Sequence, residues 1–428
     1  MNILNDIPEL VRQEIITPET ADRLRHYYQR KEATSPIRLI TVFSVLGAIL
    51  TGLGIILIIA HNWDALSRTA QTFLAFLPLL LGQALCGYAL WKKEADNTWR
   101  ESAAVFLFFA MGASISLVSQ VYHIPGDLGS FLLTWMALCL PLVYVMRSSA
   151  TSLLFLAGIT WYAAQESYWT YPSGNSYAYW LLLFSVLPYY FRLIKKQPQS
   201  NYTTFHHWLV PLSLTITLGT VAERHEELLF PAYMGLFGLF CLLGDLPYFN
   251  DQKTRNNGYL VLGSLGTVAL LLALSFADIW QGIRSEDWTG SHVMVSPEAI
   301  TATLITLAAC ALLYRQLKRE ALQAASPLAF SFVFFIAIFL YGLFNPAAVV
   351  LTNLLVLGIG ITTIRSGTRQ DHLGIINFGL LVIATLVACR FFDTDLSFVV
   401  RGVLFVLVGV GFFAMNYWIL QKRKTHEH

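Results

Sequence analysis

The sequence predicts an all-α protein, a polytopic transmembrane helix bundle of about 14 spans preceded by a short N-terminal cytoplasmic helical hairpin. Three observations support this fold class. First, 56% of the 428 residues are hydrophobic and only 13% are charged, whereas soluble domains carry roughly a quarter charged residues. Second, apolar runs long enough to cross a bilayer recur along the whole chain. Third, Lys and Arg are concentrated in alternate loops between these runs.

Residues 1–36 are predicted to form the cytoplasmic hairpin. Its first helix is indicated by apolar residues at helical spacing, namely Leu4, Ile7, Leu10, Val11 and Ile15. A second helix is expected from Thr17 onward, because Thr17 can cap it, Pro18 suits its first turn and Glu19 favours its positive end. So short a hairpin buries little apolar area. We therefore expect it to dock on the membrane domain or on a partner.

Residues 37–420 are predicted to form the transmembrane domain, and residues 421–428 a basic cytoplasmic tail. The first apolar run follows a charged leader, so we expect it to remain as the first span rather than to be cleaved as a signal peptide. Each span needs about twenty residues. The predicted spans are 38–60, 70–91, 102–121, 129–146, 149–165, 177–194, 206–222, 228–247, 258–277, 299–315, 327–343, 346–364, 373–391 and 397–420.

Positive charge predicts the orientation of these spans. Of the 28 Lys and Arg residues, 23 fall on one side of the predicted membrane domain. The other five are Arg68, Arg224, Arg284, Arg390 and Arg401. Loops rich in Lys and Arg stay in the cytoplasm, so both termini are predicted to be cytoplasmic. The loops on the opposite side are short, which leaves no segment able to fold as an external catalytic domain.

Several classes of function are disfavoured. The net charge of +2 and the absence of a basic stripe argue against nucleic-acid binding. None of the five cysteines forms a CxxC pair, so neither a metal site nor a disulfide framework is indicated. No nucleophile elbow, HExxH helix, phosphate loop or dinucleotide fingerprint occurs. The sequence therefore assigns no catalytic residue, no metal ligand and no cofactor.

Candidate substrate-binding residues gather at the outer ends of the predicted spans. They are Arg390, Arg401, Asp64, Asp127, His61, His123, Gln120 and Asp393. Charges at membrane depth are costly and normally face a cavity or a partner. On one interpretation Arg390 and Arg401 hold an anionic group, and His61 or His123 relays a proton. On the other, these residues form interfacial salt bridges and helix caps, since Asp64 and Asp127 occupy ordinary capping positions.

Two further polar groups carry weaker signals. Residues 223–227 have side chains able to bind metal, but they lack the helical histidine pair that zinc sites require, which favours a solvated acidic loop. His206 and His207 precede Trp208 near the cytoplasmic face. They are expected to be interfacial.

Several motifs resemble those of a bacterial family of predicted membrane proteins called domain of unknown function 2157. They are Leu-Val-x-x-Glu-Ile-Ile-Thr-Pro-Glu-x-Ala from Leu10 to Ala21, Gly52-Leu53-Gly54 with Asn62-Trp63-Asp64, Gln120-Val121-Tyr122-His123, and Gly126-Asp127-Leu128 with Trp135. The C-terminal Arg401-Gly402 with Phe405, Gly409 and Asn416 is also similar. The resemblance is strongest over about the first 150 residues. It implies an integral membrane protein of the bacterial envelope, hence of the inner membrane, and it implies no reaction.

Three hypotheses of function follow. The first is a transporter or flippase-like protein that moves or binds an anionic envelope lipid or solute. The second is an envelope scaffold or sensor that recruits a cytoplasmic or membrane protein through residues 1–36. The third is an intramembrane transferase on a lipid-linked substrate, for which His61, His123 and Asp127 are the only acid–base candidates. Membrane lipids are expected partners in all three.

Overall fold

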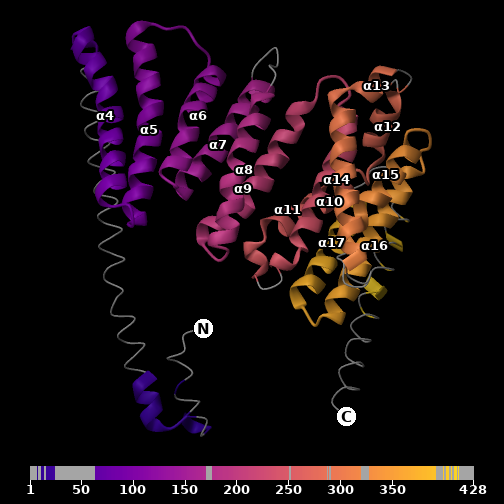
Figure 1. Cartoon of the computed structure of the whole chain (residues 1–428). Coiled ribbons are helices and arrows are strands. Elements are labelled where there is room, and N and C mark those ends of the chain that lie inside the picture. Colours follow the sequence, from indigo (N-terminus) through magenta and orange to yellow (C-terminus); the bar gives the residue numbers. More distant parts are fainter. Residues whose placement is uncertain are drawn as a thin grey trace. The chain divides into compact units, whose positions relative to one another are not determined.

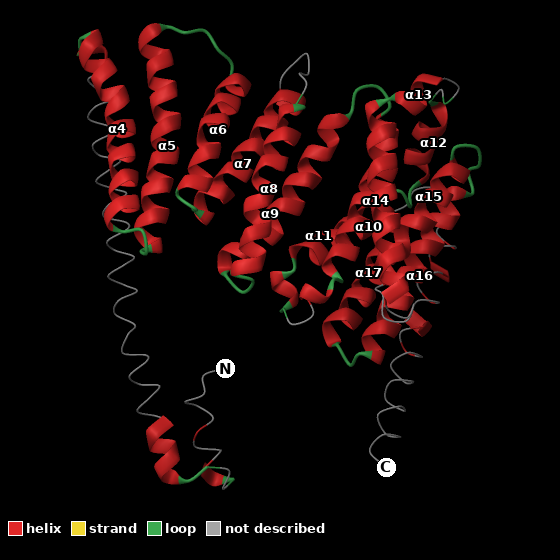
Figure 2. Ribbon diagram, viewed as in Figure 1, coloured by secondary structure: helices red, strands yellow, loops and turns green. Residues whose placement is uncertain are grey.

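The structure is a computed structural model. It describes residues 7, 11–13, 16–24, 63–169, 176–249, 252–286, 288, 291–319, 327–391, 399, 402–403, 406, 409–411 and 413. Within these residues all regular elements are helices (Figures 1 and 2). The chain divides into two compact units, Met1–Leu77 and Pro78–His428, and each is described by itself. The division falls inside helix α4, Arg68–Lys92, which contains Pro78.

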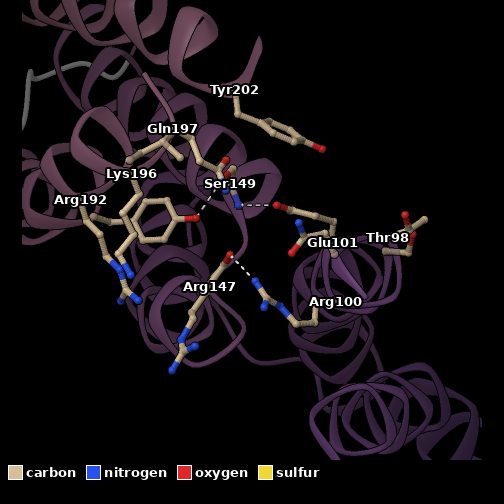
Figure 3. Close-up of a pocket in the computed structure, with 13 residues that line it drawn as sticks. Thr98, Arg100, Glu101, Arg147, Ser149, Arg192, Lys196, Gln197 and Tyr202 are labelled. Atoms are coloured by element: carbon tan, nitrogen blue, oxygen red, sulfur yellow. Dashed lines mark hydrogen bonds between the residues drawn. The ribbon is translucent and has the colours of Figure 1, made fainter. Parts of the chain in front are cut away.

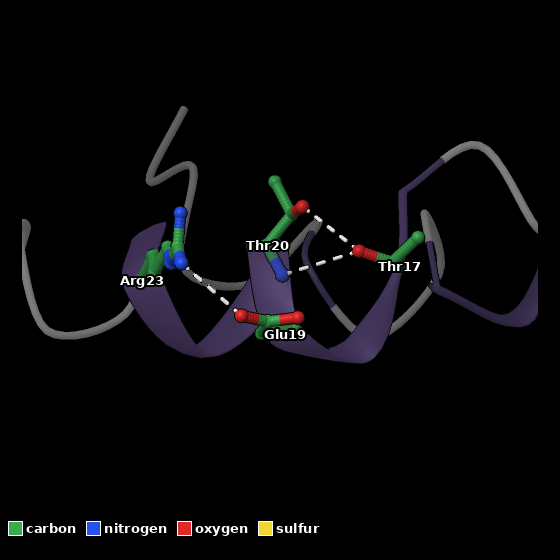
Figure 4. Close-up of polar contacts among 4 residues, drawn as sticks. All are labelled: Thr17, Glu19, Thr20 and Arg23. Carbon is green, nitrogen blue, oxygen red and sulfur yellow. Dashed lines mark hydrogen bonds and ion pairs between the residues drawn. The ribbon is translucent and has the colours of Figure 1, made fainter.

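In the first unit, residues 18–24 are helical and begin as the sequence predicts. The Thr17 hydroxyl accepts a hydrogen bond from the Thr20 N–H at 3.3 Å, and Arg23 pairs with Glu19 one turn earlier at 3.1 Å (Figure 4). Further along, the short 3-10 helix η1, Trp63–Ala65, precedes α4. The Gln71 side chain ties these two elements together by donating to the Trp63 carbonyl at 2.8 Å. The predicted span 38–60 lies outside the described residues.

In the second unit the long helices run up and down beside one another (Figure 1). Each predicted span from 70–91 to 373–391 coincides with a helix, and 397–420 lies largely outside the described residues. The helices are α5 Asn97–Tyr122, α6 Leu128–Val145, α7 Ser149–Ala164, α8 Ala178–Lys196, α9 Asn201–Leu218, α10 Leu229–Gly244, α11 Gly258–Ala273, α12 Ala277–Ser285, α13 Ser291–Val295, α14 Pro297–Arg319, α15 Ser331–Gly342, α16 Ala348–Arg369 and α17 Leu373–Phe391.

The described residues contain seven helices long and apolar enough to cross a membrane, or eight if the pair α11–α12, bent by 80°, counts as one span. The seven are Arg68–Lys92, Asn97–Tyr122, Leu128–Val145, Glu226–Gly244, Pro297–Lys318, Ala348–Arg369 and Leu373–Phe391. Helix α7 is not among them because its 16 residues extend only about 24 Å, less than the hydrocarbon core of about 30 Å. The protein is thus an all-helical membrane protein with several apolar helices.

Two hydrophobic clusters form the interior of the second unit. One contains residues of α4 to α9, the other contains residues of α12, α15, α16 and α17, and α10, α11 and α14 contribute to both. Leu236 and Phe240 of α10 face the first cluster, whereas Met234 and Cys241 face the second. In α10, 56% of the apolar window is buried, against 22–39% in the other six candidate spans. A helix that is apolar all round is a buried helix, which makes α10 the central element.

Close backbone approach and buried hydroxyl pairs hold the first cluster together. A Cβ on Gly112 of α5 would lie 2.6 Å from the Trp135 ring of α6, so the glycine lets the indole pack on the helix. The Ser152 hydroxyl of α7 bonds to His206 Nε2 of α9 at 2.9 Å, and the Thr160 hydroxyl bonds to Ser213 at 2.6 Å. Such pairs join helices where both lipid and protein are apolar.

His206 and His207 are buried within the protein, with exposed fractions of 0% and 1%. His206 Nδ1 lies 2.7 Å from the Tyr202 carbonyl oxygen. His207 Nδ1 lies 2.5 Å from the Tyr190 hydroxyl. Polar groups inside a helix bundle need hydrogen-bond partners. These contacts therefore allow both imidazole rings to be buried, which the local sequence did not indicate.

Candidate functional site

A polar pocket of about 510 Å³ lies where α5 begins and α8 ends, beside the turn between α6 and α7 (Figure 3). By the charge distribution, this is the side predicted to be cytoplasmic. The pocket is lined by Asn97, Thr98, Arg100, Glu101, Ser102, Arg147, Ser149, Tyr189, Arg192, Leu193, Lys196, Gln197 and Tyr202. Four of these residues are cationic and one is acidic, so the lining is strongly positive.

Arg100 of α5 binds the end of the neighbouring helix α6. Its guanidinium donates to the Met146 carbonyl at 3.1 Å and to the Arg147 carbonyl at 3.3 Å. The last carbonyls of a helix have no partner within the helix and carry partial negative charge. Arg100 therefore satisfies the C-terminus of α6 and fixes the turn that follows.

Glu101, the next residue, binds the start of α7. One carboxylate oxygen accepts from the Ser149 N–H at 2.8 Å, and the other accepts from the Ala150 N–H at 3.0 Å and from the Ser148 hydroxyl. The first amides of a helix are unpaired and carry partial positive charge. Glu101 is the one carboxylate among the described residues that line the pocket, and it is thus held by the amino end of α7.

Arg147 lies in the turn between these two anchored helix ends. Its φ of 49° places it in the left-handed region, and the Ser148 N–H bonds back to the Val143 carbonyl at 3.3 Å. This is the helix C-terminal turn in which glycine is the usual residue. An arginine there costs roughly 1 kcal/mol of backbone strain, and strained residues of this kind concentrate at functional sites.

Arg192 and Lys196 supply the other cations. They are four residues apart on α8, so they share one face of the helix and repel each other. Within the part of the chain that the structure describes, no carboxylate oxygen lies within 4.0 Å of the side-chain nitrogens of Arg147, Arg192 or Lys196. Figure 3 shows Arg192 and Lys196 across the pocket from Thr98.

The wall behind the pocket is made of buried hydrogen bonds. The Tyr189 hydroxyl of α8 pairs with the Ser149 hydroxyl of α7 at 3.0 Å. The Thr203 hydroxyl donates to the Gln197 carbonyl at 2.6 Å, which fixes the turn between α8 and α9. Since a carbonyl only accepts, the contact of His206 Nδ1 with the Tyr202 carbonyl assigns the proton to Nδ1. His206 Nε2 then accepts from Ser152.

The arrangement suits the binding of an oxyanion. Guanidinium groups present planar pairs of donors that match phosphate and carboxylate oxygens, and lysine adds a mobile point charge. The contacts of Glu101 are all with the start of α7. No carboxylate in the described part of the chain therefore neutralises Arg147, Arg192 or Lys196. Among the described residues, no group of three His, Cys, Asp or Glu side chains could hold a metal ion.

Three of the predicted outer residues lie at the end of α5 and in the connection to α6. Asp127 caps α6, accepting from the Ser130 N–H and hydroxyl at 2.8 Å each. The Ser130 N–H bond is the main cause that lowers the pKa of Asp127. His123 ends α5 with a φ of 54°, and its N–H bonds to the Gln120 carbonyl. The side chains of Gln120 and His123 are exposed.

The other predicted outer residues are placed apart from these or are not described. Arg390 of α17 donates to the Ser275 hydroxyl at 3.0 Å and lies over the Phe276 ring at 4.5 Å, at the break between α11 and α12. Helix α17 packs on α16 and α11, whereas α6 packs on α5, α7 and α8. The structure thus does not bring Arg390 to Asp127. Asp64 is exposed in the first unit, and His61, Asp393 and Arg401 lie outside the described residues.

The cationic pocket was not predicted from the sequence. Its Arg and Lys residues were interpreted only as the cytoplasmic charges that orient the spans, which explains them without a site. The available signal was the spacing of Arg192 and Lys196, two like charges on one face of α8 with no acidic residue one turn away. That spacing alone does not reveal that Arg147 lies beside them.

The fold and the pocket define an α-helical membrane protein with several apolar helices and a cationic site at helix ends. Residues 8–152 match the model of the family described as predicted membrane protein (DUF2157), which confirms the resemblance seen in the N-terminal motifs. Neither the curated proteins nor the solved structures gave a match. Arg100, Glu101 and Arg147 lie inside the matched segment, and the α8 part of the pocket lies beyond it.

Proposed function

We propose that this protein is a multi-pass protein of the bacterial inner membrane that binds and moves an anionic envelope lipid or solute. In this proposal Arg147, Arg192 and Lys196 hold the anionic group of that molecule. The observation that carries the proposal is a pocket of about 510 Å³ with three cations that no described carboxylate neutralises. Such a pocket attracts and concentrates anions.

The proposed topology has about 14 spans with both termini in the cytoplasm. It is supported by the helices that coincide with the predicted spans and by the concentration of Lys and Arg on one side. With this orientation the pocket opens toward the cytoplasm. Of the predicted outer residues, Gln120, His123 and Asp127 remain a second proposed contact for the same molecule.

The anion site is tested by thermal unfolding of the full chain in nanodiscs of zwitterionic lipid, with inorganic phosphate added. A ligand that binds only the folded protein stabilises it by about 2.7 kcal/mol at one hundred times its Kd. We expect phosphate to raise the Tm of the wild type. The double variant Arg192→Ala with Lys196→Ala is expected to lose this rise.

Lys195→Ala is the matched control, because Lys195 is an exposed cation on the same helix that does not line the pocket. It should keep the phosphate-dependent rise in Tm. An equal loss in Lys195→Ala and in the double variant would show that phosphate acts through general surface charge. That result would reject the pocket as the anion site.

A second candidate function is a scaffold or sensor that recruits a partner through residues 1–36. It is favoured by the capped helix at residues 18–24, with its exposed Glu19–Arg23 pair. Deleting residues 2–33 separates the two functions. A transporter would keep phosphate binding and membrane insertion, whereas a scaffold would lose its co-purifying partner.

A further inference from the structure

The pocket is larger than a simple anion requires. Pockets of about 300–1,000 Å³ usually hold drug-sized organic ligands, and this one measures about 510 Å³. A single inorganic phosphate would leave most of that space to water. The size indicates that the anionic group is attached to an organic moiety that also enters the pocket.

The uncharged part of the lining indicates what kind of moiety this is. Apart from its charged residues the pocket offers amide and hydroxyl groups and only one aliphatic side chain, that of Leu193. The amides and hydroxyls belong to Asn97, Thr98, Ser102, Ser149, Tyr189, Gln197 and Tyr202. Cations can only donate hydrogen bonds, whereas amides and hydroxyls also accept them. A moiety that bears several hydroxyls needs both kinds of partner.

Arg147, Arg192 and Lys196 lie across the pocket from the start of α5. Arg192 and Lys196 come from α8 and Arg147 from the turn between α6 and α7, whereas Asn97 and Thr98 open α5, with Thr98 on the far side (Figure 3). The Gln197 amide lies at the end of α8, next to the cations. A ligand with a charged end and a hydroxyl-bearing body can therefore contact both walls at once.

The number of cations favours a phosphate over a carboxylate. A phosphate monoester carries about −1.5 to −2 charges at pH 7 and three acceptor oxygens, so it can meet guanidinium and ammonium groups that arrive from two elements. A carboxylate offers one charge in one plane. Arg192 and Lys196 repel each other on α8 until a multivalent anion lies between them.

We propose that the pocket binds a phosphorylated polyol, that is, a sugar phosphate, either free or as the head group of a lipid. The phosphate lies among Arg147, Arg192 and Lys196, and the sugar hydroxyls meet Asn97, Thr98 and Gln197. This inference rests on the proposed anion site and names the class of its ligand.

The test measures the affinity of the full chain in zwitterionic nanodiscs for glucose 6-phosphate and for inorganic phosphate by calorimetry. We expect glucose 6-phosphate to bind about tenfold more tightly, which corresponds to about 1.4 kcal/mol. The double variant Asn97→Ala with Gln197→Ala should lose this tenfold preference for glucose 6-phosphate and keep its affinity for inorganic phosphate. Lys195→Ala should behave as the wild type.

A second arm identifies the source of the ligand. Nanodiscs that contain phosphatidylinositol 4-phosphate present a polyol with a phosphate monoester on a lipid. If they raise the Tm of the wild type but not that of the Asn97→Ala, Gln197→Ala variant, while free glucose 6-phosphate shows no excess affinity, the ligand is a lipid head group. If free glucose 6-phosphate binds more tightly than inorganic phosphate, the ligand is a soluble sugar phosphate.

Other outcomes overturn the inference. Equal affinities for glucose 6-phosphate and inorganic phosphate, without an effect of phosphatidylinositol 4-phosphate, reject the polyol and leave the anion site intact. The inference is also rejected if the Asn97→Ala, Gln197→Ala variant still binds glucose 6-phosphate more tightly than inorganic phosphate, because the added affinity then arises from other residues. Failure of inorganic phosphate and of both polyol phosphates to bind the wild type rejects the proposed function itself.

Discussion

Arg100 and Glu101 show how two adjacent residues can organise a site without forming a pair with each other. Arg100 satisfies the carbonyl end of α6, and Glu101 satisfies the amide end of α7. Each charge is matched to the helix dipole that it faces. Their contacts hold the intervening turn, and with it Arg147, at the rim of the pocket.

Replacing Glu101 by Gln should destabilise the protein by about 1–2 kcal/mol, because a charged cap on three donors becomes a neutral one. Unfolding of the purified protein in detergent with increasing denaturant measures this difference. Glu94→Gln is the control, since Glu94 is exposed and contributes only its carbonyl to Arg100. Equal stability of the two variants would mean that Glu101 does not support α7.

Asp127, the cap of α6, should make the stability of the folded protein depend on pH in the acid range. Hydrogen bonds from Ser130 lower the pKa of Asp127 in the folded protein below its ordinary value of 3.8. The cap therefore stabilises the fold above that ordinary pKa and is lost as the pH falls through the lower, folded value. We expect the Tm of the wild type relative to Asp127→Asn to fall as the pH drops below about 4.

The Asn variant isolates this effect because asparagine also caps helices but does not titrate. Every other carboxyl group is common to both proteins and cancels in the difference. A constant Tm difference between pH 6 and pH 2 would contradict the role of ionised Asp127 as the cap.

Among the elements, the contact of α9 with α11 depends on the absence of a side chain. A Cβ on Gly258 would lie 2.4 Å from the His207 carbonyl oxygen, which belongs to the backbone and cannot rotate away. This contact also positions His207 against Tyr190 and Tyr248. Small residues at such crossings let helices pack closely in membranes.

Gly258→Ala should destabilise the protein by about 1–3 kcal/mol through overpacking. Gly87→Ala, in α4, has no atom within 4 Å of the added Cβ and should be neutral or slightly stabilising, since alanine favours helix. Thermal unfolding in nanodiscs measures both variants. A neutral Gly258→Ala would show that α9 and α11 can separate at no cost.

The connection between α9 and α10 is held by a distant helix. The segment 223–227 lies between these helices, and Glu223, Arg224 and Glu226 are exposed. Its backbone is held by Glu298 of α14, whose fully buried carboxylate accepts from the N–H groups of Glu223, Arg224 and His225 at 2.6, 2.8 and 3.1 Å. A carboxylate from a distant helix thus orders this loop.

At the scale of the second unit, α10 joins two hydrophobic clusters, and the helices alternate in direction around it (Figure 2). This alternation predicts that loops at opposite ends of α9 lie on opposite sides of the membrane. Lys195 lies before the start of α9, and Glu226 follows its end; both are exposed.

Labelling of single cysteines in a variant without the five native cysteines tests this orientation. A maleimide that does not cross membranes should label Glu226→Cys in intact spheroplasts and Lys195→Cys only after lysis. The physical reason is the retention of Lys and Arg loops in the cytoplasm. The reverse pattern would invert the topology and place the cationic pocket outside.

The sequence by itself determined the class of the protein, the positions of the helices that coincide with the predicted spans from 70–91 to 373–391, the Thr17 cap and the family resemblance of residues 8–152. It did not predict the short helices α12 and α13. These features follow from local properties. A bilayer imposes a length and a hydropathy on each segment, and a cap depends on neighbours three residues away. Features that depend only on neighbouring residues can be predicted from the sequence alone.

Only the tertiary structure decided which residues meet. Arg147 and Arg192 share a pocket, Glu298 binds amides 73 to 75 residues away, and His206 and His207 are buried. Inside a membrane, the side of a helix that faces lipid is as apolar as the side that faces another helix. Hydropathy therefore does not say which helices are neighbours. Side-chain shape and buried hydrogen bonds set the neighbours, and they placed the cations of separate loops around one cavity.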